Sequence, residues 1–165
     1  MKNKLALVTG SFDPITSGHV DVTRRAARLF AHVIVLVAQN EQKQYLFSAD
    51  ERAEIARAAL ADIPNVTVET WDGYVADFAR EHGADAFVRG IRNSVDLPYE
   101  QGMAEKNLEL CGIDTVLLFA KPEYHAVSST DVRALLKSGA CIGSLMPDAA
   151  AALAREILDK KRVEL

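Results

Sequence analysis

The most informative stretch of the sequence is Gly10-Ser11-Phe12-Asp13-Pro14-Ile15-Thr16-Ser17-Gly18-His19. An apolar run typical of a buried strand, Leu5-Ala6-Leu7-Val8, precedes it, and an amphipathic pattern follows from about His19. A strand, a glycine-containing loop and a helix start bring free backbone N–H groups and the positive end of a helix dipole together. This order predicts a phosphate site, with His19 placed to donate to a phosphate oxygen. A turn followed by a surface histidine is the simpler interpretation of Gly18 and His19 taken alone.

Short apolar runs alternate with amphipathic segments along the chain. Runs rich in Val, Leu, Ile or Phe predict strands at Lys4–Thr9, His32–Ala38, Val66–Thr70, Ala86–Arg89 and Thr115–Ala120. The amphipathic segments predict helices at Gly18–Phe30, from the capping-box pattern Ser48-Ala49-Asp50-Glu51 onward, at Tyr74–His82, at Pro98–Leu110, from Ser129 to before Gly139, and at Asp148–Lys160. The alternation predicts one α/β domain over residues 1–165, a Rossmann-like, doubly wound fold with a five-stranded parallel sheet and helices on both faces. In such a sheet, ligands bind beyond the carboxyl ends of the strands.

Composition limits the partners of this chain. It has 165 residues and a net charge of −4, which gives no general electrostatic support for coating nucleic acid. No apolar run approaches the roughly 20 residues that span a bilayer. The two cysteines, Cys111 and Cys141, lack metal-ligand spacing, and the first residues lack the pattern of a secretory signal. We therefore expect a cytoplasmic protein with reduced thiols that binds neither nucleic acid nor membranes.

Further candidate residues fall at predicted strand ends and helix starts. Lys43 follows the second strand, where a solvated side chain is the simpler interpretation. Arg89 closes the fourth strand at the ligand edge, where a guanidinium can fork onto phosphate or form a surface ion pair. Asp96 opens a helix, and an N-cap is its simpler role. The segment Tyr124–Thr130 ends in three hydroxyl residues that can bind phosphate or ribose, cap the next helix, or do both.

Several common site types are missing from the sequence. It has no Walker loop, no Gly-x-Gly-x-x-Gly after the first strand, no Gly-x-Ser-x-Gly and no cluster with zinc spacing. A histidine, a lysine and two arginines around a glycine loop remain. That set suits phosphoryl or nucleotidyl transfer by positioning and charge stabilisation, without a covalent enzyme intermediate.

The stretch from Gly10 to His19 resembles the T/H-x-G-H signature of the nucleotidylyltransferase superfamily, and its extended form resembles the phosphopantetheine adenylyltransferase branch. The resemblance covers nearly the whole chain, because further motifs follow in the order of that branch: Lys43, Arg89-Gly90-Ile91-Arg92, Asp96, Tyr99-Glu100 and Val127-Ser128-Ser129-Thr130. It implies a reaction in which ATP and 4′-phosphopantetheine give dephospho-coenzyme A and pyrophosphate with Mg²⁺. This is the penultimate step of coenzyme A biosynthesis, by in-line attack on the α-phosphorus.

The resemblance also implies roles for individual residues. His19 stabilises charge on the α-phosphate during transfer, and Lys43 and Arg89 hold the acceptor phosphate and the phosphates in flight. Ser11 contacts both substrates, and Phe12 gives a backbone contact to ATP.

Other parts of the chain complete the implied site. Val75, near Tyr74, contacts the pantetheine arm. The remaining ATP-binding residues are Gly90, Ile91, Arg92, Glu100, Tyr124, His125, Ala126, Val127, Ser128, Ser129 and Thr130. No protein ligand is assigned to Mg²⁺, because this metal often stays with phosphates and water.

The resemblance further implies a homohexamer and feedback binding by coenzyme A, and we expect the contact surface around the last two helices. Two other functions stay open. One is a related adenylyl- or cytidylyltransferase with another acceptor, such as nicotinate mononucleotide. The other is a non-catalytic nucleotide-binding module or sensor.

Overall fold

A parallel sheet of five strands, in the order β3-β2-β1-β4-β5, forms the centre of the computed structural model, which describes residues 3–40 and 42–163. The strands are β1 (Leu5–Gly10), β2 (His32–Ala38), β3 (Val66–Trp71), β4 (Ala86–Ile91) and β5 (Thr115–Phe119). The helices are α1 (Ser17–Leu29), α2 (Ala49–Leu60), α3 (Val75–Glu81), α4 (Asp96–Cys111), α5 (Ser129–Ser138) and α6 (Asp148–Val163), with short 3₁₀ turns η1 (Pro122–Tyr124) and η2 (Gly143–Leu145). The predicted Rossmann-like fold is confirmed.

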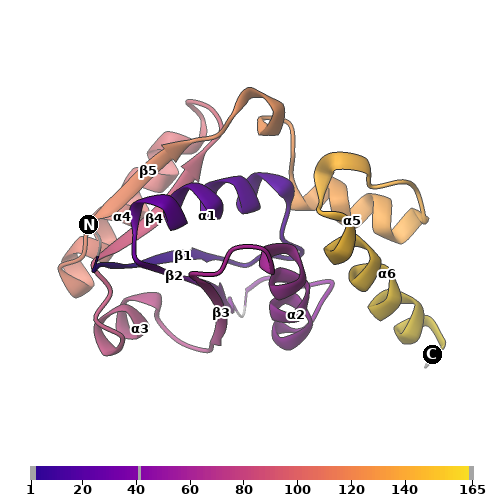
Figure 1. The fold of residues 1–165 in the computed structure, drawn as a ribbon, viewed down its shortest axis with the longest axis horizontal. Helices are drawn as coiled ribbons and strands as arrows, with labels where there is room; N and C mark the ends of the chain where they lie inside the picture. The colour runs from indigo at the N-terminus through magenta and orange to yellow at the C-terminus, as the bar shows by residue number, and fades with distance from the viewer. Residues whose placement is uncertain (1–2, 41, 164–165) are drawn as a thin grey trace.

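Helices cover both faces of the sheet, which explains why its inner strands are almost continuously apolar. Neighbouring residues of β1 alternate between two buried clusters, since Ala6 and Val8 belong to one and Leu7 to the other. Phe78 of α3 shares the cluster of Leu7, whereas α1 and α2 contribute to the cluster of Ala6. In Figure 1, α1 lies on one side of β1 and β2 and α3 on the opposite side. α6 packs against α2, and the two chain ends lie at opposite ends of the long axis.

The strand order reverses at β1, and this reversal creates a crevice. β2 and β3 lie on one side of β1, and β4 and β5 lie on the other. The ladder between β1 and β2 continues to Gly10 opposite Val37, but the ladder between β1 and β4 ends earlier, at Val8 opposite Val88. The loops that follow β1 and β4 therefore diverge at the carboxyl edge, which is where a doubly wound sheet binds its ligand.

The predicted helix and strand bounds are confirmed to within one to three residues, and local caps explain most of them. Ser48 caps α2 through its side chain, which accepts from the Glu51 N–H at 3.2 Å, while the Glu51 carboxylate accepts from the Ser48 N–H at 2.7 Å. Gly83 takes a positive φ of 62° just after α3, as its place beyond the helix end requires.

The start of α4 differs from the prediction. The helix begins at Asp96, two residues before Pro98, and its N-cap is Val95. The predicted role of Asp96 as an N-cap is therefore wrong. Its carboxylate instead accepts from the backbone N–H and the guanidinium of Arg92, at 3.0 Å each.

Most of the exposed large apolar side chains among the described residues lie on α4 and at the end of β5, and α6 adds Val163, which is 87% exposed. Val95, which precedes α4, is 81% exposed, and Tyr99 of α4 and Phe119 of β5 are 62% and 74% exposed. Of the described residues of α5 and α6, Val163 is the large apolar side chain that is most exposed. None of the described helices combines the length and the apolar character needed to cross a membrane.

We predict that Gly90→Ala destabilises the fold, because a Cβ at this position would lie 2.9 Å from Cγ2 of Val22 in α1. Val22 is β-branched and cannot easily move aside. The free energy of unfolding, measured by urea denaturation, should fall by about 1–3 kcal/mol.

Two further variants test the cause of that loss. Gly102→Ala is the matched control, because no atom of the described residues lies within 4 Å of a Cβ there and alanine favours a helix interior by up to about 1 kcal/mol. Adding Val22→Ala to Gly90→Ala should restore part of the lost stability. A Gly90→Ala protein as stable as the wild type would contradict the close approach of β4 to α1.

Candidate active site

A cavity of about 660 Å³ lies at the carboxyl edge of the sheet, where β1 and β4 diverge. The loops after β1, β2 and β4, the first turn of α1 and the start of α5 enclose it. Most residues predicted from the sequence line this cavity: Ser11, Phe12, His19, Lys43, Arg89, Gly90, Arg92, Glu100, Tyr124, Val127, Ser128, Ser129 and Thr130. The structure therefore brings together motifs that are up to 119 residues apart in the sequence.

Four predicted residues lie outside the cavity lining. Ile91 is buried in β4, and His125 and Ala126 are exposed beside η1. Val75, at the start of α3, packs against the apolar cluster on the other face of the sheet. The proposed roles of these four residues stay predictions.

The loop after β1 is held by bonds to distant parts of the chain. The Asp13 carboxylate is buried and accepts from the N–H groups of Leu46 and Phe47 at 2.9 and 3.0 Å. On the other side, the Ser129 hydroxyl donates to Pro14 O at 2.8 Å, and Arg133 Nη1 donates to Asp13 O at 2.7 Å. The loop is thus tied both to the segment before α2 and to α5, which fixes the floor of the cavity.

His19 occupies the third position of α1 and completes a capping box with Thr16. The Thr16 N–H donates to Nδ1 of His19 at 3.1 Å, so Nδ1 is the acceptor and the ring proton is assigned to Nε2. Phe12 packs edge-on against the imidazole, with ring centroids 5.2 Å apart. Since Nδ1 faces the helix cap, Nε2–H is left as the donor toward the cavity.

The imidazole of His19 is neutral at physiological pH. Burial, followed by the positive charges of Arg89 and Arg92, lowers the pKa of His19 to about 4. A neutral ring with its proton on Nε2 donates a hydrogen bond without first taking a proton from solvent.

The side chain of Arg89 bridges the split between β1 and β4. Its Nη1 donates to Thr9 O, and its Nε and Nη2 donate to the two carboxylate oxygens of Glu100 at 2.7 and 2.8 Å. Burial acts to lower the pKa of Arg89, but the hydrogen bonds and charge of Glu100 outweigh it and raise that pKa. Nε and Nη2 of Arg89 are therefore occupied by Glu100, and Nη1 is bonded to Thr9 O. Since Nη1 and Nη2 each carry two hydrogens, one N–H of each is left for a ligand.

Four cationic and three acidic side chains line the cavity within the described residues. Besides the pair Arg89–Glu100, Arg92 pairs with Asp96 at 3.0 Å, and Arg133 lies 3.9 Å from the Asp13 carboxylate. Lys43, by contrast, makes no ion pair within residues 3–40 and 42–163. An anion entering the cavity meets fixed arginines and one long, exposed lysine.

Sequence reasoning missed Arg133 and Tyr45, which also line the cavity. Arg133 Nη2 donates to the Thr130 hydroxyl at 3.0 Å, so its guanidinium lies next to the hydroxyl run that opens α5. An arginine three residues after a hydroxyl run, one turn into a helix, is a signal in the sequence that could have identified it. The position of Tyr45 depends on a contact with α2 and has no comparable local signal.

This arrangement suits a polyphosphate. The first turns of α1 and α5 converge on the cavity with their positive dipole ends, next to a neutral imidazole donor and four cations. In a site of low dielectric, such fixed donors stabilise negative charge that develops on a phosphoryl group.

Comparison with known proteins agrees with this chemistry. The cytidylyltransferase-like family model matches residues 7–135, which include every loop of the cavity. Phosphopantetheine adenylyltransferase of Acidovorax sp. (strain JS42) is 50% identical over 134 residues, 81% of each protein. The same enzyme of Levilactobacillus brevis is 44% identical over 144 residues, and that of Desulforudis audaxviator is 42% identical over 145 residues. Each of these two matches covers 87% of this chain and 89% of the relative.

We predict that His19 stays neutral, with its proton on Nε2, until the pH falls well below 5. An NMR titration of selectively ¹⁵N-histidine-labelled protein reports both the tautomer and the pKa. A titration midpoint near 6.5, or a proton on Nδ1, would show that the cap does not hold the ring as described.

The same shift links His19 to stability. An unfolded histidine titrates near 6.5, so between pH 6.5 and 4 the unfolded state binds a proton that folded His19 does not. The contribution of His19 to the free energy of unfolding therefore falls as the pH is lowered through this range and is constant above it. The variant His19→Asn should lose less stability than the wild type between pH 7 and 5.

Proposed function

We propose that this chain, which belongs to the cytidylyltransferase-like family and, within it, to the phosphopantetheine adenylyltransferases, transfers the adenylyl group of ATP to 4′-phosphopantetheine, giving dephospho-coenzyme A and pyrophosphate. This is the penultimate step of coenzyme A biosynthesis. The observation that carries the proposal is the Nε2–H of His19, left as a donor beside the N-terminus of α1 while Nδ1 serves the cap.

The proposed step is an in-line attack of the acceptor phosphate on the α-phosphorus of ATP, with pyrophosphate leaving. One bond forms, from the acceptor phosphate oxygen to the α-phosphorus, and the bond from that phosphorus to the bridging oxygen breaks. A phosphate dianion carries no proton to remove, so the step needs no general base. Because the acceptor displaces pyrophosphate directly, the step also needs no covalent enzyme intermediate. The difficulty lies in bringing two anions together, which donors and cations offset.

Each cavity residue has a part in this proposal. His19 donates to the α-phosphate as negative charge develops on that phosphate. The N–H groups of Arg89 that are left for a ligand hold the phosphates from the side opposite His19. Glu100 keeps Arg89 in place through two hydrogen bonds, which limits the loss of entropy on binding. Lys43 is exposed on a loop, and its long side chain binds the acceptor phosphate as that phosphate approaches ATP.

The adenosine end of ATP is assigned by the same reasoning. Gly90 and Arg92 lie at the end of β4, and Tyr124 and Val127 lie on the segment between β5 and α5, on the same cavity. The hydroxyls of Ser128 and Ser129 already bond within the protein, so their backbone N–H groups at the α5 terminus are the donors we expect to meet the terminal phosphates.

Mg²⁺ fits this site as an ion held by the phosphates. The three carboxylates of the cavity are engaged, because Asp13 accepts two backbone N–H groups and Asp96 and Glu100 pair with arginines. The donor set within the described residues thus favours an ion bound through triphosphate oxygens and water, as Mg²⁺ commonly is. Its chemistry would be to neutralise charge on the phosphates.

Assembly, feedback and location belong to the proposal. We propose a homohexamer, and the exposed apolar side chains on α4 and β5 support self-association. Coenzyme A shares the pantetheine arm of the substrate and is the proposed feedback ligand. We propose a cytoplasmic location, where ATP is available.

The acceptor assignment is tested by measuring ATP-dependent pyrophosphate release with two acceptors. We expect release with 4′-phosphopantetheine and none above background with nicotinate mononucleotide. The opposite preference would assign the related transferase activity, and ATP binding without release from either acceptor would indicate a nucleotide-binding module.

We predict that His19→Ala lowers kcat by about 10²-fold or more, because it removes a donor that acts most strongly in the transition state. Steady-state pyrophosphate release measures kcat and the KM for ATP. Because His19 also caps α1, His19→Gln is the matched control: glutamine at the third position restores a capping box. The thermal midpoint should recover in His19→Gln while kcat stays well below the wild-type value. A wild-type kcat in His19→Ala would remove the imidazole from the mechanism.

A further inference from the structure

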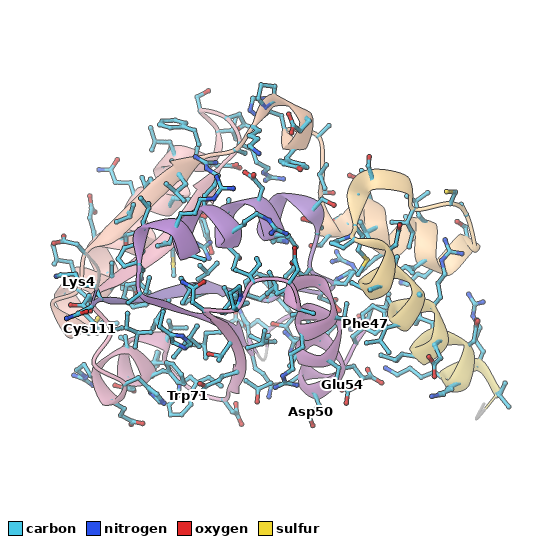
Figure 2. The ribbon with its side chains drawn as sticks, viewed as in Figure 1. Lys4, Phe47, Asp50, Glu54, Trp71 and Cys111 are labelled. Carbon is cyan, nitrogen blue, oxygen red and sulfur yellow. The ribbon has the colours of Figure 1, made fainter. Side chains whose placement is uncertain are left out.

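Among residues 3–40 and 42–163, Arg52 is the largest side chain that is fully buried, with 0% of its surface exposed. It lies in the first turns of α2, and its neighbours Asp50 and Glu54 on the same helix point into solvent (Figure 2). Arg52 instead turns inward, where its Nη1 donates to Ser11 O at 2.6 Å and to Ala38 O at 3.2 Å. One guanidinium nitrogen thus joins the loop after β1 to the end of β2.

The charge of Arg52 is not neutralised by a contact ion pair within the described part of the chain. The Asp13 carboxylate acts on Arg52 through its charge but makes no ion pair with it, and Nε and Nη2 of Arg52 have no hydrogen-bond partner there. The ring of Tyr45 covers the guanidinium at 4.0 Å. Burying a charge without close compensation costs several kcal/mol, so a purely structural role explains this arginine poorly.

The bond to Ser11 O also orients the next amide. Ser11 O and the Phe12 N–H belong to the same peptide unit, and this peptide is trans, so the two groups point in opposite directions. The Phe12 N–H therefore points away from Arg52, and within the described residues it donates to no other group. Phe12 also holds a φ of +49°, a conformation that costs a non-glycine residue about 1–3 kcal/mol unless its surroundings enforce it.

We propose that Arg52 is a positioning residue: by holding Ser11 O it aims the Phe12 N–H into the cavity as a phosphate donor, and its buried charge strengthens that donor. The proposal rests on the proposed function, because it assumes a phosphate of ATP in this cavity. A hydrogen bond accepted by the carbonyl polarises the peptide unit and makes its N–H a better donor.

Tyr45 extends this role to the loop that carries Lys43. The Tyr45 hydroxyl accepts from the Asn40 N–H at 2.9 Å, and the Lys43 N–H donates to Asn40 O at 2.9 Å. The stacked ring thereby connects the guanidinium to the turn on which Lys43 sits. Arg52 is the point at which both phosphate-binding loops are joined to α2.

The test compares the affinities of the full-length protein for ATP and for adenosine, measured by isothermal titration calorimetry. In Arg52→Met we expect the Kd for ATP to rise at least about tenfold, while the Kd for adenosine changes less than about twofold. The matched control is Arg57→Met, because Arg57 on the same helix donates to a backbone carbonyl, Val68 O at 3.1 Å, outside the cavity. Both affinities should stay within about twofold of the wild type in that variant.

A spectroscopic measurement separates positioning from simple stabilisation. The amide ¹⁵N resonance of Phe12 should shift in Arg52→Met, because its peptide carbonyl loses a charged donor, and should not shift in Arg57→Met. If Arg52→Met does not fold, Arg52→Lys carries the test: it keeps the charge but lacks the planar fork, so ATP binding should weaken selectively.

Each outcome decides the proposal. An unchanged ATP affinity in the Arg52 variants, or equal losses for ATP and adenosine, would overturn it. The proposed function is tested separately, because it fails if the wild type binds ATP but releases no pyrophosphate with 4′-phosphopantetheine. The comparison of Arg52 with Arg57 does not depend on the acceptor.

Discussion

The hydrogen bond from the Thr16 N–H to Nδ1 of His19 is the constraint on which the site depends. It completes the cap of α1 and therefore fixes where the positive end of that helix lies. It also decides which nitrogen of the imidazole carries the proton, and it leaves that nitrogen for the cavity. One local interaction thus places the positive end of the helix dipole and the ring donor at the same end of β1. The ring can donate without first taking a proton from solvent.

The arginines of the cavity are held in position by the protein itself. Arg89 is held by Glu100, Arg92 by Asp96, and Arg133 by the backbone of Asp13. Fixed cations lose little entropy on binding and need little reorganisation as charge moves during transfer. Lys43 differs, because it lies exposed on a loop. This contrast between paired arginines and one exposed lysine suits a site that holds one phosphate group while a second approaches it.

Local patterns in the sequence were enough for most of the fold. The alternating apolar runs predicted the strands, and the Ser48 capping box predicted the start of α2, because both signals act over a few neighbouring residues. The predicted N-cap role of Asp96 was wrong, since its carboxylate bonds back to Arg92 and the N-cap of α4 is Val95.

The site was predicted only in part for the same reason. Its residues could be named from motifs, but their partners could not. The bond of Arg89 to Glu100 and that of Arg52 to Ser11 join segments 11 and 41 residues apart, and they require β4 to lie beside α4 and α2 to lie beside the first loop. The structure also separates the two roles that the sequence left open for Arg89, because its fork is occupied by the Glu100 carboxylate.

The role of His19 is best tested by a crystal structure with a bound, non-hydrolysable ATP analogue. We expect the α-phosphate at the first turn of α1, with one of its oxygens about 3 Å from Nε2 of His19. An analogue whose phosphates lie away from that nitrogen, with the imidazole free or turned to solvent, would contradict it.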